Sequence, residues 1–317
     1  MANTMTIQNV QDLLDPNMEQ IFYNYMAVNK PFWSRIAKRT TTSKYNSEIS
    51  MISGLPVASE TQLYQKPGVL APTQGYSQSQ TQKKVSFEVI VYEEMWRFVN
   101  EPGDLLAMFG DNRTTSAMFR PIDSYIDNAV AKMFTHGESL TGPDAVYYAS
   151  ASHPLPDSSN EWSNYLASGS ARPLQESYVK DMLTLINQCP DLNGEPAELL
   201  DRFPAQMLVS PANQQLAMRI CQSVGMPGTA NNDINALPEM GLSRTPLVWS
   251  RLDSAFKGSN NVDWWIFFPQ VSIYVVFGVD PFNKSWVDND DNYHFVGKCF
   301  VDVIFVEPRG YWFADGA

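Results

Sequence analysis

The chain has 317 residues, of which 44% are hydrophobic, and it carries a formal net charge of −12 at pH 7. A chain of this length and apolar content can bury a large core, in one large domain or in two smaller ones. The acidic balance argues against a protein that wraps nucleic acid over its whole surface, because neutralising phosphates requires an excess of Lys and Arg.

The N-terminal stretch lacks the charged start and the apolar run of a signal peptide, and no apolar run approaches the length of a membrane span. The cysteines Cys189, Cys221 and Cys299 are far apart and do not have the spacing of a metal site. We therefore expect buried, free thiols in a protein that is made and kept in the cytosol, or in an assembly formed there.

The first segment combines helical apolar spacing with a run of cations. Apolar residues from Ile7 to Leu14 predict one helix, and Asp15 and Pro16 can begin a second that continues the apolar stripe to Met26. We expect this stripe to need a cover, for which a neighbouring subunit is one candidate. The cations that follow have no acidic residue among them. They indicate either a solvated face or a surface that binds DNA or an acidic partner. They are Lys30, Arg35, Lys38, Arg39 and Lys44.

The next segment predicts a long β-hairpin. Ser47 to Ile52 reads as a short strand, a polar and turn-rich stretch follows, and Lys84 to Tyr92 alternates apolar and polar residues. A two-stranded ribbon is marginally stable in water. We therefore expect it either to lie across another molecule, to be mobile, or to be a disordered surface loop.

A long helix is predicted from Pro121 to Gly137. Its apolar residues recur every three to four positions, and they are Ile122, Tyr125, Ile126, Ala129, Val130 and Met133. The helix would span about 25 Å, and more if it continues upstream of a kink at Pro121. We expect its stripe to pack against the alternating C-terminal strand Tyr293 to Val306, through Phe295, Val301, Val303 and Phe305.

The segments between this helix and the last strand alternate in type. A brief strand is expected at Ala145 to Ala149, an amphipathic helix from Pro173 to Cys189, and a strand at Gln206 to Val209. Ser210 and Pro211 then begin a helix that ends near Gly225, and Asn231 to Thr245 is loop. Three further strands are predicted at Leu247 to Trp249, Trp264 to Phe268 and Val271 to Val279.

No pattern in the chain indicates catalysis, so we predict neither enzymatic activity nor a cofactor. Asp288, Asp290 and Asn292 begin like a calcium loop, but Tyr293 replaces the turn glycine and Cys299 the closing Glu, so a solvated turn is the favoured interpretation. Ser152 and His153 are adjacent and therefore lack the approach geometry of an acyl-transfer site.

Four stretches of the chain, in this order, resemble the major capsid proteins of tailed bacteriophages, especially the Mu-like head-subunit branch of the Hong Kong 97 fold. They run from Gly75 to Phe98, from Asp144 to Pro154, from Phe203 to Cys221 and from Trp264 to Pro269. The second Pro that often follows the first in the family's strand-to-helix junction is Ala212 here, which weakens that motif but not its placement.

The resemblance implies an α+β fold of four regions. These are an N-terminal arm (1–46), an extended loop (47–92), a peripheral domain (93–143 and 280–317) and an axial domain (144–279). The extended loop is implied to contact neighbouring subunits, through Leu63, Tyr64, Lys66, Val69, Leu70 and Tyr76. The basic cluster is expected on the inner face of the shell. Some relatives join subunits through a Lys to Asn isopeptide bond, but no Asn partner for Lys66 is identifiable.

The implied function is a head protein that self-assembles through pentamers and hexamers into an icosahedral shell around double-stranded DNA, which it contacts without sequence specificity. The implied location is the virion, assembled in the host cytoplasm and without a membrane. Further implied partners are a portal, decoration or cement proteins, and a scaffolding protein, expected as a separate chain because no long charged helix precedes the arm. The alternatives are an encapsulin-like bacterial compartment, which would need cargo enzymes, and a cytosolic enzyme.

Overall fold

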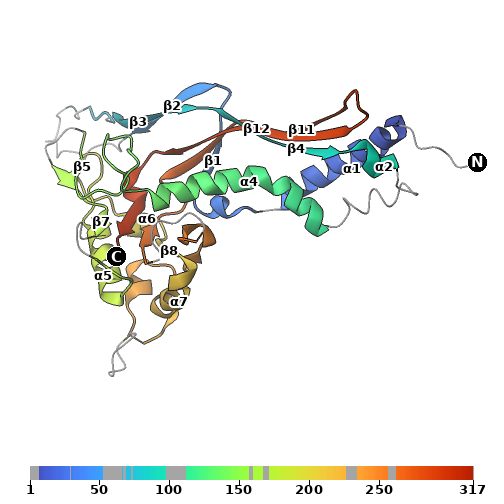
Figure 1. Ribbon diagram of the computed structural model, residues 1–317. Helices are drawn as coiled ribbons and strands as arrows, with labels where there is room; N and C mark the ends of the chain where they lie inside the picture. The colour runs from blue at the N-terminus through green and yellow to red at the C-terminus, as the bar shows by residue number, and fades with distance from the viewer. Residues whose placement is uncertain are drawn as a thin grey trace, which may run out of the picture.

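The computed structural model describes residues 7–28, 30–52, 66, 69–72, 74–97, 112–156, 160–166, 171–225, 234–255 and 262–316. An elongated layer of long strands over a long helix forms one part of the molecule, and a lobe of short helices and strands hangs from one end of it (Figure 1). Helices and sheets are both prominent, which confirms the predicted α+β class. The α-helices are α1 (Ile7–Val28), α2 (Glu93–Arg97), α4 (Asn112–Thr135), α5 (Glu176–Asn187), α6 (Leu199–Arg202) and α7 (Gln214–Gln222).

The strands form two larger sheets and two small ribbons. The sheet of the elongated layer has the order β1-β11-β12-β4, and the sheet of the lobe has the order β7-β13-β10-β8-β9. The strands are β1 (Lys38–Thr41), β2 (Asn46–Ile52), β3 (Gln74–Thr81), β4 (Lys83–Val91), β5 (His153–Pro154), β6 (Glu161–Trp162), β7 (Tyr165–Leu166), β8 (Gln206–Val209), β9 (Leu247–Val248), β10 (Trp264–Phe267), β11 (Ile273–Val287), β12 (Tyr293–Phe305) and β13 (Tyr311–Ala314).

Strand β11 is longer than predicted, because it continues past Val279 to Val287. The sequence there contains Asp280 and Pro281, which normally interrupt a strand. Register shifts between Phe277 and Phe282 let the chain pass these residues before regular pairing with β12 resumes. The result is a long β11–β12 hairpin that extends beyond β1 and is paired with β4 along its distal part.

The predicted hairpin partner is wrong. Strand β2 pairs with β3, the Gln- and Ser-rich stretch that was expected to be loop. Strand β4 pairs with β12 instead, with Val91 opposite Tyr293 and Val85 opposite Cys299. The apolar alternation of β4 explains this choice, because a strand with one apolar face is stabilised by joining the sheet that covers the core.

Helix α4 confirms the predicted helix but begins earlier, at Asn112, so Pro121 lies inside it and not in its first turn. A proline inside a helix removes one backbone hydrogen bond, which an exposed position such as that of Pro121 tolerates best. Ile122, Ile126 and Val130 are at most 1% exposed, as the stripe predicts, whereas Tyr125 is 40% exposed and lies outside it.

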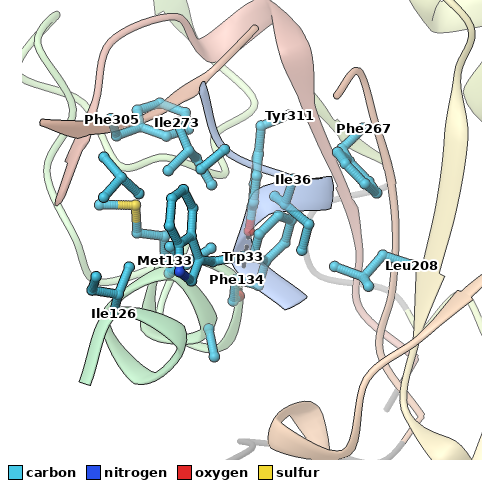
Figure 2. Packing of buried hydrophobic residues seen from close by; sticks show 14 of the residues in the cluster. Trp33, Ile36, Ile126, Met133, Phe134, Leu208, Phe267, Ile273, Phe305 and Tyr311 are labelled. Atoms are coloured by element: carbon cyan, nitrogen blue, oxygen red, sulfur yellow. Dashed lines mark hydrogen bonds between the residues drawn. The ribbon is translucent and has the colours of Figure 1, made fainter. Parts of the chain in front are cut away.

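The α4 stripe packs against the four-stranded sheet. Ile126 and Met133 share one buried cluster with Val301 and Phe305 of β12, and Val303 packs at its edge (Figure 2). Phe295 belongs instead to the cluster that covers α1. The predicted contact between helix and last strand is therefore confirmed, except at Phe295.

Helix α1 is a single helix that includes Pro16, and not two short ones. Its buried residues Leu14, Met18 and Phe22 pack against the distal end of the four-stranded sheet, on Val91, Tyr293 and Phe295. A neighbouring subunit was one candidate for this cover, but the chain's own sheet covers the stripe at Leu14, Met18 and Phe22.

The lobe is built around β10, which is buried on both faces. Trp264 and Ile266 face the cluster of α5 and α7, while Trp265 and Phe267 face the α4 cluster. Its continuous apolar run fits a strand that is covered on both sides. Strand β13, which pairs with β10, was not predicted from the sequence.

Most other elements of the lobe lie where they were expected. Helices α5 and α7 and strands β8, β9 and β10 fall within the predicted segments, and a short 3-10 helix, Leu237–Met240, lies in the expected loop. The strand expected at Ala145 to Ala149 is a turn, in which Ala145 has a φ of 63°. All the cysteines are free and buried, and burial raises the pKa of the Cys221 and Cys299 thiols to about 12.

Candidate functional surfaces

The basic segment does not form one patch. Lys38 and Arg39 lie next to each other in β1, so their side chains point to opposite faces of the sheet. Lys38 Nζ lies 5.4 Å above the ring of Tyr274. Arg39 donates to Asp280 at 2.7 Å on the other face, where it lines a hollow together with Lys30.

The remaining cations are exposed. Arg35 ends a short 3-10 helix, Phe32–Arg35, and its guanidinium lies 5.6 Å from the ring of Phe32. Lys44 lies in the turn between β1 and β2. The pairing of Arg39 with a carboxylate reduces the positive charge that this segment presents, which the sequence pattern could not reveal.

The segment before β1 is held by α4. Asp127 Oδ1 accepts a hydrogen bond of 2.9 Å from the backbone N–H of Trp33, and Arg251 Nε lies 3.8 Å from the same carboxylate. Burial raises the pKa of Asp127. The arm is therefore fixed to the rest of the subunit both by α1 and by the hydrogen bond of Trp33, so the basic residues have defined positions.

The hairpin β2–β3 lies on the face of the four-stranded sheet away from α4 (Figure 1). Met51 of β2 is buried in a cluster with Val276, Ile304 and Leu192, and Ile49 packs at its edge. The base of this ribbon is therefore neither mobile nor dependent on another molecule, because the chain's own sheet and lobe cover it.

The candidate contact residues of the extended loop differ in their surroundings. Lys66, Val69 and Leu70 are exposed, and Val69 is 92% exposed. Tyr76 is half-buried, and its hydroxyl donates to the carbonyl of Pro154 at 3.0 Å within the same chain. Leu63 and Tyr64 lie outside the described residues.

A cluster that the sequence reading missed lies at the distal end of the sheet. His294 of β12 contacts Glu88 of β4 through Nδ1 at 2.7 Å and Asp288 through Nε2 at 3.0 Å. Its ring stacks on Trp286 of β11, with centroids 5.0 Å apart. The Asp288 contact is the main cause that raises the pKa of His294.

Asp288 shapes the turn that was compared with a calcium loop. Its Oδ1 accepts hydrogen bonds from the backbone N–H groups of Asp290 and Asn292, and its Oδ2 accepts from the Asn292 side chain. The bond to His294, and after it these bonds within the turn, lower the pKa of Asp288. The Asp288 carboxylate therefore holds the turn together. No group of three or more side chains that could bind a metal occurs among the described residues.

His153 is buried next to an acid. Its Nδ1 lies 2.6 Å from Asp144 Oδ2, both side chains are 1% exposed, and its ring stacks on Trp162. A substrate could not reach this imidazole without displacement of the surrounding chain. The pair joins the turn after α4 to β5, which is a structural role.

Comparisons with known proteins identify structures with a similar fold. No protein-family model and no curated protein matches the sequence. The capsid structure of the cyanophage P-SCSP1u is similar at a TM-score of 0.51 and 12% identity, over 90% of this chain and 87% of that one. The capsid of an empty GTA particle is similar at a TM-score of 0.51 and 11% identity, over 89% and 88%. The predicted capsid-type fold is thereby confirmed.

Among the described residues, no helix is both long and apolar enough to cross a membrane.

Proposed function

We propose that the chain is the repeating subunit of a closed protein shell that forms by self-association. The observation that supports this most strongly is a fold shared with two capsid structures over about nine-tenths of the chain. We further propose that the shell is the icosahedral head of a tailed bacteriophage, of the Mu-like branch, and that it encloses double-stranded DNA. The resemblance of Gly75 to Phe98 and of Phe203 to Cys221 supports this finer assignment.

We assign the four regions of the subunit as an arm (1–46), an extended loop (47–92), a peripheral domain (93–143 and 280–317) and an axial domain (144–279). The long α4 and the β11–β12 hairpin build the peripheral domain, and the lobe with α5 and α7 is the axial domain. Strand β11 crosses the boundary at 279/280, and β13 of the range 280–317 pairs with β7 and β10 of the lobe, so the peripheral and axial domains share strands at two places. A shared strand makes their relative movement small.

The exposed part of the extended loop is the proposed contact with a neighbouring subunit. Val69 and Leu70 are apolar and exposed, whereas the base of the hairpin is packed on its own chain. Burying apolar surface is favourable by about 25 cal/mol per Å². The loop tip therefore gains stability when it lies on another subunit, and the packed base gives it a fixed starting direction.

The basic segment is the proposed inner surface for DNA. Lys30 and Lys44 are exposed, and no carboxylate of the described residues lies within ion-pair distance of either. Because backbone phosphates are recognised by charge, such contacts carry no sequence specificity. Replacing both lysines with Glu should lower the DNA content of particles. Unchanged DNA content would contradict this placement.

The other proposed partners follow from the same assignment. They are further copies of the chain in pentamers and hexamers, a separate scaffolding protein, a portal, and decoration or cement proteins. The proposed location is the virion, assembled in the host cytoplasm.

The proposal is tested by the mass and content of the purified protein in solution. Light scattering after size exclusion should give particles of many subunits, compared with 35.7 kDa for one chain. Particles from infected cells should contain nuclease-protected double-stranded DNA. Particles filled with an enzyme would indicate a bacterial compartment, and a monomer at all concentrations would refute self-assembly.

A further inference from the structure

A groove on the distal part of the four-stranded sheet carries a local excess of positive charge. It lies on the face away from α4, because its residues alternate along β4 with the core-facing Val85 and Phe87. The hairpin β2–β3 covers the middle of this face but not its distal part (Figure 1). The residues that line the groove include Lys84, Glu88, Lys284, Trp286, Val296 and Lys298.

The three lysines of the groove have no carboxylate partner among the described residues. Lys284 Nζ lies 6.0 Å from the ring of Trp286, and Lys298 Nζ lies 4.8 Å from the ring of Phe282. Aromatic rings hold the aliphatic stems against the sheet but do not neutralise the ammonium groups. Glu88 is the acid that lines the groove, and its carboxylate is engaged by His294 at 2.7 Å.

The end of the same hairpin carries the opposite charge. Asp290 is exposed in the turn between β11 and β12, and the bonds to Asp288 hold this turn in one shape. The backbone N–H of Glu93 donates to Asn292 Oδ1 at 3.0 Å, which fixes the start of α2 beside the turn and brings the exposed Glu94 to the same end. A rigid acidic tip thus lies next to a basic groove.

The tip cannot reach the groove of its own chain. Strands β11 and β12 are paired without interruption from Phe282 to Val287, so the hairpin cannot fold back on the lysines of its own stem. Double-stranded DNA is disfavoured as the occupant, because Asp290 and Glu94 beside the groove repel a polyanion and the chain has a net charge of −12. A second copy of the chain offers a matching acidic tip of defined shape.

We propose that the groove formed by Lys84, Lys284 and Lys298 receives the acidic tip around Asp290 from another copy of the chain. This contact rests on the proposed self-assembly and identifies one of its interfaces. Trp286 and Val296 supply an apolar floor that excludes water, and the charges set the register of the two copies. A wrongly aligned copy would place like charges opposite each other, so the contact also discriminates against wrong alignments.

The test uses particles assembled from a mixture of ordinary and ¹⁵N-labelled full-length chains. A zero-length carbodiimide reagent joins a lysine to a carboxylate only where the two are in direct contact. Mass spectrometry should find peptides that join Lys284 or Lys298 of one isotope to Asp290 of the other. Particles without any such mixed peptide would overturn this interface but leave self-assembly intact. Failure of the unmodified chain to associate at all would overturn both.

Charge exchange provides an independent readout. The variant with Lys284→Glu and Lys298→Glu, and the variant Asp290→Lys, should each form about tenfold fewer particles, whereas the combined triple variant should recover assembly. The variant with Lys284→Arg and Lys298→Arg keeps both positive charges in the groove and is the matched control, which should assemble normally. Equal assembly of all variants would overturn the proposal. So would a lysine variant that lowers only the nucleic-acid content while Asp290→Lys has no effect.

Discussion

The hydroxyl of Tyr293 donates a hydrogen bond of 2.7 Å to the carboxylate of Asp15, although the two residues are 278 positions apart. It fixes helix α1 to the start of β12, where Leu14 and Phe22 pack on the same strand. Burial, together with the bond to Asp15, raises the pKa of Tyr293, so the hydroxyl remains a donor. The arm is therefore part of the folded subunit before any assembly takes place.

The variant Tyr293→Phe should destabilise the unassembled subunit by about 1–2 kcal/mol, because it removes a hydrogen bond to a charged acceptor and leaves the ring in place. Tyr147→Phe, at a residue that is 52% exposed, should change the stability by less than about 0.5 kcal/mol. Urea unfolding of both variants measures the difference. Equal stabilities would mean that the arm does not dock on its own subunit in solution.

The variant Ile126→Asp should leave the subunit unfolded or aggregated. Ile126 is 1% exposed in the cluster under α4, and an unpaired carboxylate there should cost roughly 3 kcal/mol or more. Asn128 is unsuitable as the control, because it accepts a hydrogen bond from Arg251. Tyr125→Asp, at a residue that is 40% exposed, should cost about 0.5 kcal/mol. Thermal unfolding compares them, and equal melting temperatures would contradict the packing of α4.

The stability of the subunit should fall as the pH rises past neutrality. The folded state raises the pKa of His294 above its ordinary 6.5, mainly through Asp288. The stabilisation by protonated His294 is therefore complete below about pH 6.5 and is lost as the pH rises through the raised pKa. We expect a loss of roughly 2 °C in melting temperature from this group between about pH 6 and pH 8.5. His294→Phe keeps a ring against Trp286 and should remove this part of the slope, whereas an unchanged slope would exclude His294 as its source.

Removal of the extended-loop tip should abolish assembly without unfolding the subunit. Ile52 and Gln74 face each other in the β2–β3 register, so an Asn-Gly turn can replace residues 53–73 directly. The base of the hairpin would remain packed on Val276 and Ile304, which preserves the melting temperature. A Gly/Ser loop of the original length is the control that separates length from side-chain contacts. Normal particles from the Asn-Gly variant would refute the role of the tip.

The sequence predicted those elements whose signal is local. Helix α5 and strand β8 have a clear period and a flanking proline, and α4 has a regular apolar stripe, so their positions were found. Strand β3 is rich in Gln and Ser and so has no apolar alternation of its own. It is a strand because it pairs with β2, and no local pattern reveals that pairing. Pro16 suggested the start of a second helix, and the predicted strand ended at Val279, but α1 continues through Pro16 and β11 through Pro281.

The candidate surfaces were predicted less completely, because they depend on tertiary structure. The basic segment is contiguous in sequence, but the alternation of β1 and the partner Asp280 divide it. The lysine groove joins β4 to the β11–β12 hairpin, whose residues are about two hundred positions away in the chain. His294, Glu88 and Asp288 likewise meet only because β4 pairs with β12.

Electron cryo-microscopy of the purified protein will show whether the chain builds a closed shell. We expect closed icosahedral particles in which pentamers and hexamers of this subunit have the lobe of α5 and α7 at their centres and the extended loop over a neighbour. Free single subunits under all assembly conditions, or particles in which the extended loop contacts only its own chain, would contradict it.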